Sequence, residues 1–171
     1  MGGIVQGAGV DIPLHMAQGR GGGIVMGSNG IALLLVEDNP DHAELTMKAL
    51  QRGKLANRIH WVKDGEEALH YLFHEGRYTN QQEAPRPGLI LLDIRLPKVD
   101  GLEILRRVKG DDTLRTIPVV MLTTSDRGEE VAESYRLGAN SYITKPVRFT
   151  EFIEKIETVE IYWLLTNRLP N

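Results

Sequence analysis

The chain has 171 residues, which is enough for one ordinary domain with a sizeable core and too few for two. Its composition, 42% hydrophobic and 25% charged, excludes a fibrous or mostly disordered protein. A net charge of −3 offers no basic field to a nucleic-acid backbone, and the lack of cysteine excludes disulfides and thiolate chemistry. No apolar run approaches the roughly 18 residues that span a bilayer. We expect a cytoplasmic protein without direct nucleic-acid or membrane partners.

The first 30 residues differ in composition from the rest of the chain. They hold 10 of the 18 glycines and show neither helical nor strand periodicity. Such a segment loses much backbone entropy on ordering and has little apolar area to offset that loss. We expect residues 1–30 to be a flexible leader or a segment left over from cloning, followed by one domain over residues 31–158.

From residue 31 onward, short apolar runs alternate with segments of helical spacing. The apolar runs predict five strands, at residues 31–36, 58–62, 89–93, 117–124 and 141–144. The helical segments lie near residues 40–53, 65–74, 101–109 and 125–138, and a last one begins near residue 149. Asn39 is expected to cap the first helix, and Ser125 or Asp126 the fourth. A polar loop of unusual length, residues 75–87, precedes the third strand.

The alternation of strands and helices indicates an α/β fold. Strands that are apolar throughout are typical of a parallel sheet covered on both faces. We therefore predict a single domain with a five-stranded, doubly wound parallel sheet. In such folds ligands bind beyond the carboxyl ends of the strands, so the polar residues at those ends are the candidate site.

Three acids, a hydroxyl and an ammonium group follow the predicted strands. Glu37 and Asp38 end the first strand, Asp93 ends the third, Thr123 ends the fourth, and Lys145 follows the fifth. Crowded carboxylates repel one another unless a cation neutralises them, and their hard oxygens suit Mg²⁺. An ionised aspartate beside such a metal can attack a phosphoryl group, while Lys145 and Thr123 hold the transferred oxygens.

Four motifs in chain order resemble the CheY-like receiver domain of bacterial response regulators, which has a flavodoxin-like fold. The matching segments are LLVEDNPDHAEL, LILLDIRLPKVDG, PVVMLTTSD and GANSYITKP. The resemblance implies phosphoryl transfer from a histidine kinase to Asp93 in a Mg²⁺-dependent reaction. It implies a phosphoacceptor in a phosphorelay rather than a turnover enzyme.

The resemblance also assigns a role to each site residue. Asp38 would bind Mg²⁺ directly, Glu37 mainly through water, and Arg95 through its backbone carbonyl. Thr123 would be the switch hydroxyl and Tyr142 the switch aromatic. In the family the lysine–proline peptide is cis, so Lys145 and Pro146 are expected to be joined by a cis bond. Phosphorylation is then expected to reshape the face formed by the fourth helix, the fifth strand and the last helix.

Other positions are expected to tune the reaction. Thr124 stands where the family usually has a smaller residue, which would hinder small phosphodonors. Arg95 and Ser125 occupy positions that in the family influence how readily water attacks the phosphoryl group. His70 and His74 have the spacing of a metal pair on one helix face, but a solvated face is the favoured interpretation because no third ligand is evident.

The long loop before the third strand and the ending WLLTNRLP resemble stand-alone regulators paired with phytochrome-type histidine kinases, which are commonly homodimeric. We expect residues 159–171 to extend the last helix and, with its apolar residues such as Trp163, to contribute to a dimer contact. These few residues are too short for an output domain, so output is expected through protein contacts.

Two other functions are compatible with parts of the pattern. An aspartyl-phosphate phosphatase on a similar sheet would need a second acid two residues after the nucleophile, where this chain has Arg95. A receiver that has lost phosphorylation and acts only as a dimerisation or interaction module is the alternative to the phosphoacceptor. The intact set of acids with Thr123 and Lys145 argues against it.

Overall fold

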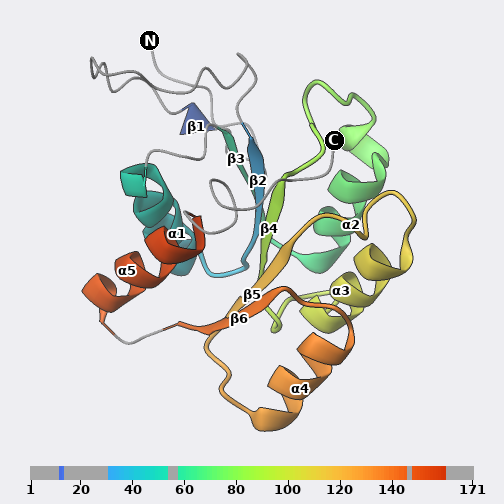
Figure 1. Cartoon of the computed structure of the whole chain (residues 1–171). Helices are drawn as coiled ribbons and strands as arrows, with labels where there is room; N and C mark the ends of the chain where they lie inside the picture. The colour runs from blue at the N-terminus through green and yellow to red at the C-terminus, as the bar shows by residue number, and fades with distance from the viewer. Residues whose placement is uncertain (1–11, 14–30, 54–57, 146–147, 161–171) are drawn as a thin grey trace.

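The computed structural model describes residues 12–13, 31–53, 58–145 and 148–160 (Figure 1). The strands are β1 Ile12–Pro13, β2 Ala32–Val36, β3 Arg58–Val62, β4 Leu89–Leu92, β5 Val119–Thr123 and β6 Ser141–Thr144. The helices are α1 Pro40–Gly53, α2 Gly65–Phe73, α3 Gly101–Gly110, α4 Gly128–Arg136 and α5 Phe149–Glu160, with a short 3₁₀ helix at Gly76–Tyr78. None of the described helices has the length and apolar character required to cross a membrane.

The predicted parallel sheet is confirmed. Strands β3, β2, β4, β5 and β6 pair in parallel in that spatial order. Along the chain, the sheet grows from β2 to β3 in one direction and from β4 through β5 to β6 in the opposite direction. The carboxyl ends of β2 and β4 therefore flank the crevice expected of a doubly wound sheet. The sequence did not predict β1, a two-residue strand within the expected leader, which pairs antiparallel with the outer edge of β3. The rest of residues 1–30 lies outside the described part of the chain.

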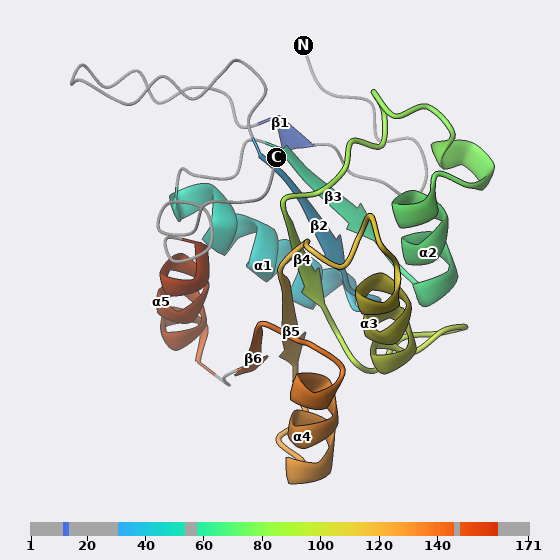
Figure 2. The same ribbon diagram turned by 45° about the vertical axis from the view of Figure 1, so that its right-hand side comes forward.

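Helices cover both faces of the sheet. Figures 1 and 2 show α1 and α5 on one face, and α2, α3 and α4 on the other. Strand β2 explains this arrangement, because its side chains alternate between two apolar clusters. Leu33 and Leu35 pack towards α1 and α5, whereas Leu34 and Val36 pack towards α2 and α3. A strand buried on both sides has no polar position, which accounts for its continuous apolar run.

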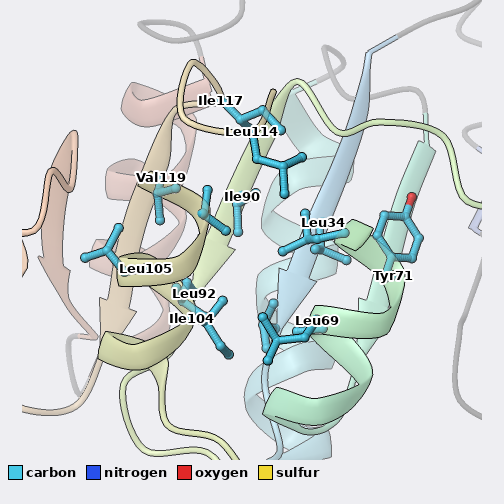
Figure 3. Packing of buried hydrophobic residues seen from close by; sticks show 14 of the residues in the cluster. Leu34, Leu69, Tyr71, Ile90, Leu92, Ile104, Leu105, Leu114, Ile117 and Val119 are labelled. Atoms are coloured by element: carbon cyan, nitrogen blue, oxygen red, sulfur yellow. The ribbon is translucent and has the colours of Figure 1, made fainter. Parts of the chain in front are cut away.

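The cluster beneath α2 and α3 forms the larger core. Figure 3 shows Leu34 and Ile90 from the strands together with Tyr71 from α2 and Ile104 from α3. The side chains of Leu34, Ile90 and Ile104 are completely buried. Burial of such side chains provides most of the driving force that holds these helices on the sheet.

The long loop between α2 and β4 is held by specific contacts. The Tyr71 hydroxyl donates to the Pro85 carbonyl at 2.8 Å, and Nε2 of His74 lies 2.9 Å from the Ala84 oxygen. The guanidinium of Arg86 donates to the Thr113 carbonyl on the α3–β5 connection. The loop therefore packs against the domain at the amino ends of the strands, away from the candidate site.

Helix α4 begins differently from the prediction. It starts at Gly128, so Arg127 holds the N-cap position, and no side-chain cap is made there. The prediction that Ser125 or Asp126 caps this helix is wrong. The Ser125 oxygen accepts instead from the Arg127 amide at 3.4 Å, within the turn that precedes the helix.

Candidate phosphoacceptor site

The three predicted acids lie together at the carboxyl edge of the sheet. Glu37 and Asp38 follow β2, Asp93 follows the neighbouring strand β4, and their carboxylate oxygens lie within 4.8 Å of one another. Glu37 and Asp93 are buried, whereas Asp38 is exposed. The amides of Glu37 and Asp93 donate to Val62 and Val36, both at 3.1 Å, so the ladder of the sheet fixes where each acid stands.

Lys145 provides the positive charge of the site. Its side chain is 6% exposed; its ammonium group binds Oε2 of Glu37 and lies 3.3 Å from Oδ2 of Asp93. The backbone amide of Lys145 donates to the Thr123 carbonyl at 2.7 Å, which continues the pairing of β6 with β5. A single buried ammonium therefore bridges two carboxylates that would otherwise repel each other.

The charge of Lys145 does not fully offset the effect of burial on the pKa of Glu37. Burial raises the pKa of Glu37 to about 7, although the charge and hydrogen bond of Lys145 lower it. The nearby Asp93 carboxylate raises it further. Three hard carboxylates in one cluster, one of them open to solvent, are a suitable donor set for a divalent cation that keeps some of its waters.

Asn39 links the acidic pair to helix α1, as its predicted N-cap role requires. Its side-chain oxygen accepts from the amides of Asp41 at 2.9 Å and His42 at 3.2 Å. Its own amide donates to Oε1 of Glu37 at 3.1 Å. The residue that starts the helix therefore also orients one carboxylate of the site.

A glycine allows the loop after Asp93 to close tightly. A β-carbon at position 101 would lie 2.0 Å from the Asp93 carbonyl oxygen, so only glycine fits there. The Gly101 amide donates to the Ile94 carbonyl at 2.8 Å, and Asp100 caps α3 by accepting from the Glu103 amide at 3.0 Å. The turn at Asp100-Gly101 therefore places the start of α3 against the backbone of Asp93.

Thr123 and Tyr142 both contact the backbone of Ser125. The buried Thr123 hydroxyl accepts from the Ser125 amide at 3.3 Å, and the Tyr142 hydroxyl donates to the Ser125 carbonyl at 2.8 Å. The Tyr142 hydroxyl is protonated at neutral pH even at its ordinary pKa of 10, and burial raises that pKa further. The two predicted switch residues are therefore connected through the loop between β5 and α4.

Arg95 has contacts with two parts of the molecule. Its amide lies 3.4 Å from Oδ1 of Asp93, and its guanidinium donates to Oε1 of Glu130 on α4 at 2.6 Å. Thr123, Ser125 and Lys145 lie at the carboxyl ends of β5 and β6, whereas Tyr142 lies within β6 and contacts the Ser125 carbonyl with its hydroxyl. Pro146 lies outside the described residues, so the peptide that joins it to Lys145 is not described.

Two residues near the site were missed by the sequence interpretation. Nδ1 of His42 lies 3.3 Å from the Lys145 nitrogen and 4.0 Å from Oε1 of Glu37. The indole of Trp61 donates to the Glu37 carbonyl at 2.8 Å. His42 could have been found from its place in the first helical turn after the acids. Trp61 had no signal beyond its position on a buried strand.

His70 on α2 and His74, the C-cap residue after that helix, do not form a metal site among the described residues. His74 uses its Nε2 on the Ala84 oxygen, while Nε2 of His70 lies 4.0 Å from Glu75. The acidic cluster that follows β2 and β4 is the only group of three potential metal ligands in the described part of the chain. His70 is partly exposed, as the solvated-face interpretation expects, whereas His74 contacts the loop before β4.

The fold and the acidic cluster are those of a receiver domain. Residues 33–157 match the response regulator receiver domain family, and the chain therefore belongs to it. The predicted family and fold are confirmed, and the chain is a response regulator of two-component signalling.

Individual relatives are matched over nearly the whole of their own length. The chain is 43% identical over 150 residues to the probable methanogenesis regulatory protein FilR2 of Methanothrix harundinacea, covering 87% of this chain and 94% of the relative. It is 38% identical over 138 residues to the response regulator Rcp1 of Synechocystis, covering 81% of this chain and 92% of the relative.

Solved structures give the same result. The phosphorylated cyanobacterial phytochrome response regulator RcpA aligns with a TM-score of 0.78 and 41% identity, covering 84% of this chain and all of that one. The Mn²⁺-bound form of Rcp1 aligns with a TM-score of 0.76 and 37% identity, covering 82% of this chain and 99% of that one. A divalent metal ion therefore occurs in a structure of a relative with this fold.

Proposed function

We propose that this protein is a single-domain response regulator that accepts a phosphoryl group on Asp93 from a histidine kinase in a Mg²⁺-dependent reaction. The observation that carries the proposal is the acidic cluster of Glu37, Asp38 and Asp93 with Lys145 bridging its two buried members. A purely structural domain has no need for three carboxylates and a buried ammonium in one pocket, since burying charge is costly.

In this proposal Asp93 is the nucleophile. One of its carboxylate oxygens forms a bond to phosphorus while the bond between phosphorus and the kinase histidine nitrogen breaks. Mg²⁺, when bound, supplies charge neutralisation for the transferred oxygens. The groups that would hold it are the Asp38 and Asp93 carboxylates and the Arg95 backbone carbonyl, with Glu37 acting mainly through water. Lys145 would turn from its carboxylate partners to a phosphoryl oxygen.

The switch would follow from the new charge. Thr123 would turn its hydroxyl towards the phosphoryl group and thereby lose its contact with the Ser125 amide. Because Tyr142 binds the carbonyl of the same residue, movement of this loop would reach Tyr142 and α4. The face formed by α4, β6 and α5 would then change shape for a partner or a second copy of the chain.

The names of the relatives suggest partners. RcpA is described as a phytochrome response regulator, which supports a phytochrome-type kinase as the phosphodonor. We also propose that the chain acts as a cytoplasmic homodimer through the face formed by α4, β6 and α5 and the C-terminal residues, and that it binds no nucleic acid. FilR2 is described as a probable methanogenesis regulatory protein, so kinases from other pathways belong in the same test.

Phosphotransfer from purified histidine kinases tests the proposal. The wild type should gain a phosphoryl group only when Mg²⁺ is present, and Asp93→Asn should gain none while keeping the same circular dichroism spectrum. Asp100→Asn, an acidic residue of the same loop outside the cluster, is the matched control and should be phosphorylated normally. Failure of the wild type to accept phosphate from any kinase or to bind beryllofluoride would instead favour the interaction module.

A further inference from the structure

A buried tryptophan holds the backbone of the acidic pair. Trp61 lies on β3 and is 8% exposed, and its indole N–H donates to the Glu37 carbonyl at 2.8 Å in a buried hydrogen bond. The Glu37 amide donates to the neighbouring Val62 carbonyl. Both backbone polar groups of Glu37 are therefore fixed by β3, one by the ladder of the sheet and one by a side chain.

The position of this carbonyl matters because the next residue in the chain is Asp38. The Glu37 carbonyl belongs to the peptide that joins Glu37 to Asp38, so its direction sets the plane from which Asp38 departs. The Glu37 carboxylate is already held by Asn39 and Lys145. Asp38 is exposed, and the place of its carboxylate depends mainly on its backbone. The indole bond thus acts chiefly on the exposed acid.

The rest of the indole is fixed as well. Trp61 packs in the apolar cluster beneath α1 and α5, and the ammonium of Lys63 lies 5.0 Å from its ring centroid. A ring held by packing on one side and covered by a cation on another has little freedom to rotate. The donor is therefore rigid, which is what a residue that supports a metal ligand requires.

We infer that Trp61 is a positioning residue of the phosphoacceptor site: its indole N–H fixes the Glu37–Asp38 peptide so that the Asp38 carboxylate is set for a divalent cation. This inference rests on the proposed function, because it assumes that the acidic cluster binds Mg²⁺. It goes beyond that function by assigning a role in metal affinity to a residue outside the predicted set of metal ligands.

The sharpest test removes the N–H and keeps the ring. Benzothienylalanine, an isostere of tryptophan with sulfur in place of the N–H, replaces Trp61. The second tryptophan of the chain is first changed by Trp163→Phe, so that the analogue enters at position 61 alone. Trp61→Phe is the simpler variant. Ile156→Val, in the same apolar cluster on α5, is the matched control for lost packing. The dissociation constant for Mg²⁺ is measured by calorimetry, and phosphotransfer is measured at limiting and at saturating Mg²⁺.

A positioning role predicts a specific pattern. Both Trp61 variants should bind Mg²⁺ about tenfold more weakly, the lower end of the effect typical for groups that support a metal ligand. Their phosphotransfer should be slow at limiting Mg²⁺ and recover at saturating Mg²⁺. Ile156→Val should lower the midpoint of urea unfolding and leave the Mg²⁺ dissociation constant unchanged.

Two results would overturn the inference. If the benzothienylalanine protein is folded and binds Mg²⁺ as tightly as its Trp163→Phe parent, the indole N–H contributes only to packing. If the wild type itself binds no Mg²⁺, the proposed function fails at its metal step, and the role of Trp61 fails with it. The first result leaves the proposed function intact, so the two failures are distinguishable.

Discussion

Helices α3 and α4 are neighbours on the same side of the sheet, but they are held there by different kinds of contact (Figure 2). Helix α3 is capped by Asp100 and buries three large apolar side chains completely, those of Ile104, Leu105 and Val108. Helix α4 has no side-chain cap, and Ser134 is its one fully buried residue. The first helix is fixed by apolar burial, whereas the second depends largely on polar groups.

The polar attachment of α4 leads directly to the acidic site. Arg95, two residues after Asp93, binds Oε1 of Glu130, while the second oxygen of that carboxylate is buried and has no hydrogen-bond partner among the described residues. A charged contact responds to new charge nearby, but an apolar interface does not. This domain therefore combines a helix held by apolar burial and a helix held largely by polar contacts around one site, which is the arrangement that the proposed switch requires.

The largest expected effect concerns the response of each helix to phosphorylation. With a phosphodonor and Mg²⁺, amide hydrogen exchange should change in α4 and in the loop before it, and stay constant in α3. The Asp93→Asn variant should show neither phosphotransfer nor this change, because the charge that drives it is never added. An equal change in hydrogen exchange in both helices would contradict the view that α4 responds to phosphorylation and α3 does not.

Shortening an apolar side chain of α3 should lower the free energy of unfolding more than shortening one of α4. Ile104→Ala removes a fully buried side chain and should lower the free energy of unfolding by about 2–5 kcal/mol. Val131→Ala on α4, where the side chain is only partly buried, should cost less than about 1 kcal/mol. Urea denaturation measures both. Similar losses would mean that α4 is anchored as firmly as α3.

The pH should affect the buried acidic pocket. Because the folded pKa of Glu37 is about 7, above its ordinary 4.5, a proton competes with Mg²⁺ at and below neutral pH. The Mg²⁺ dissociation constant should rise roughly tenfold from pH 8 to pH 6. Calorimetry at both pH values measures it, and Glu37→Gln should remove most of the dependence. A dissociation constant that is the same at both pH values would contradict a buried Glu37 carboxyl with a raised pKa.

The same pKa has a consequence for the metal-free protein. Because burial raises the pKa of Glu37 from 4.5 to about 7, the folded protein binds this proton more tightly than the unfolded chain does. The resulting contribution to the free energy of unfolding is fully present below pH 4.5 and is lost as the pH rises through about 7. The difference in unfolding midpoint between the wild type and Glu37→Gln should therefore grow over this range in favour of the variant. Added Mg²⁺ should reduce it.

The smallest effect is expected at the ion pair between the loop and α4. Because the Arg95 side chain is 57% exposed, its pairing with Glu130 should contribute less than about 1 kcal/mol. A double-mutant cycle with Arg95→Gln and Glu130→Gln measures this coupling, and high salt should weaken it. The pair Arg106 and Glu103, within α3, is the control. Its loss should not alter hydrogen exchange in α4, whereas loss of the Arg95 contact should increase it.

Much of the site was predictable because it follows strands. Asp93 and the acidic pair could be assigned to one edge from the alternation of elements alone, since parallel strands of such a sheet place their carboxyl ends together. Lys145 followed from the same rule. The start of α4 was not predictable, because Ser125 and Asp126 satisfy the local preferences for a cap and the N-cap position nevertheless falls on Arg127.

Periodicity is a local property, and it was enough to predict the order of strands and helices and the residues at the carboxyl edge. The resemblance of four short motifs to a known family indicated the rest of the assignment. Only the folded chain revealed that Lys145 bridges Glu37 and Asp93, that Arg95 contacts α4, and that the Trp61 indole donates to the Glu37 carbonyl. These contacts join residues that are far apart in the chain, such as Trp61 and Glu37, which are 24 positions apart. Their formation depends on how the strands are ordered and how the side chains pack, and neither is encoded in any single segment.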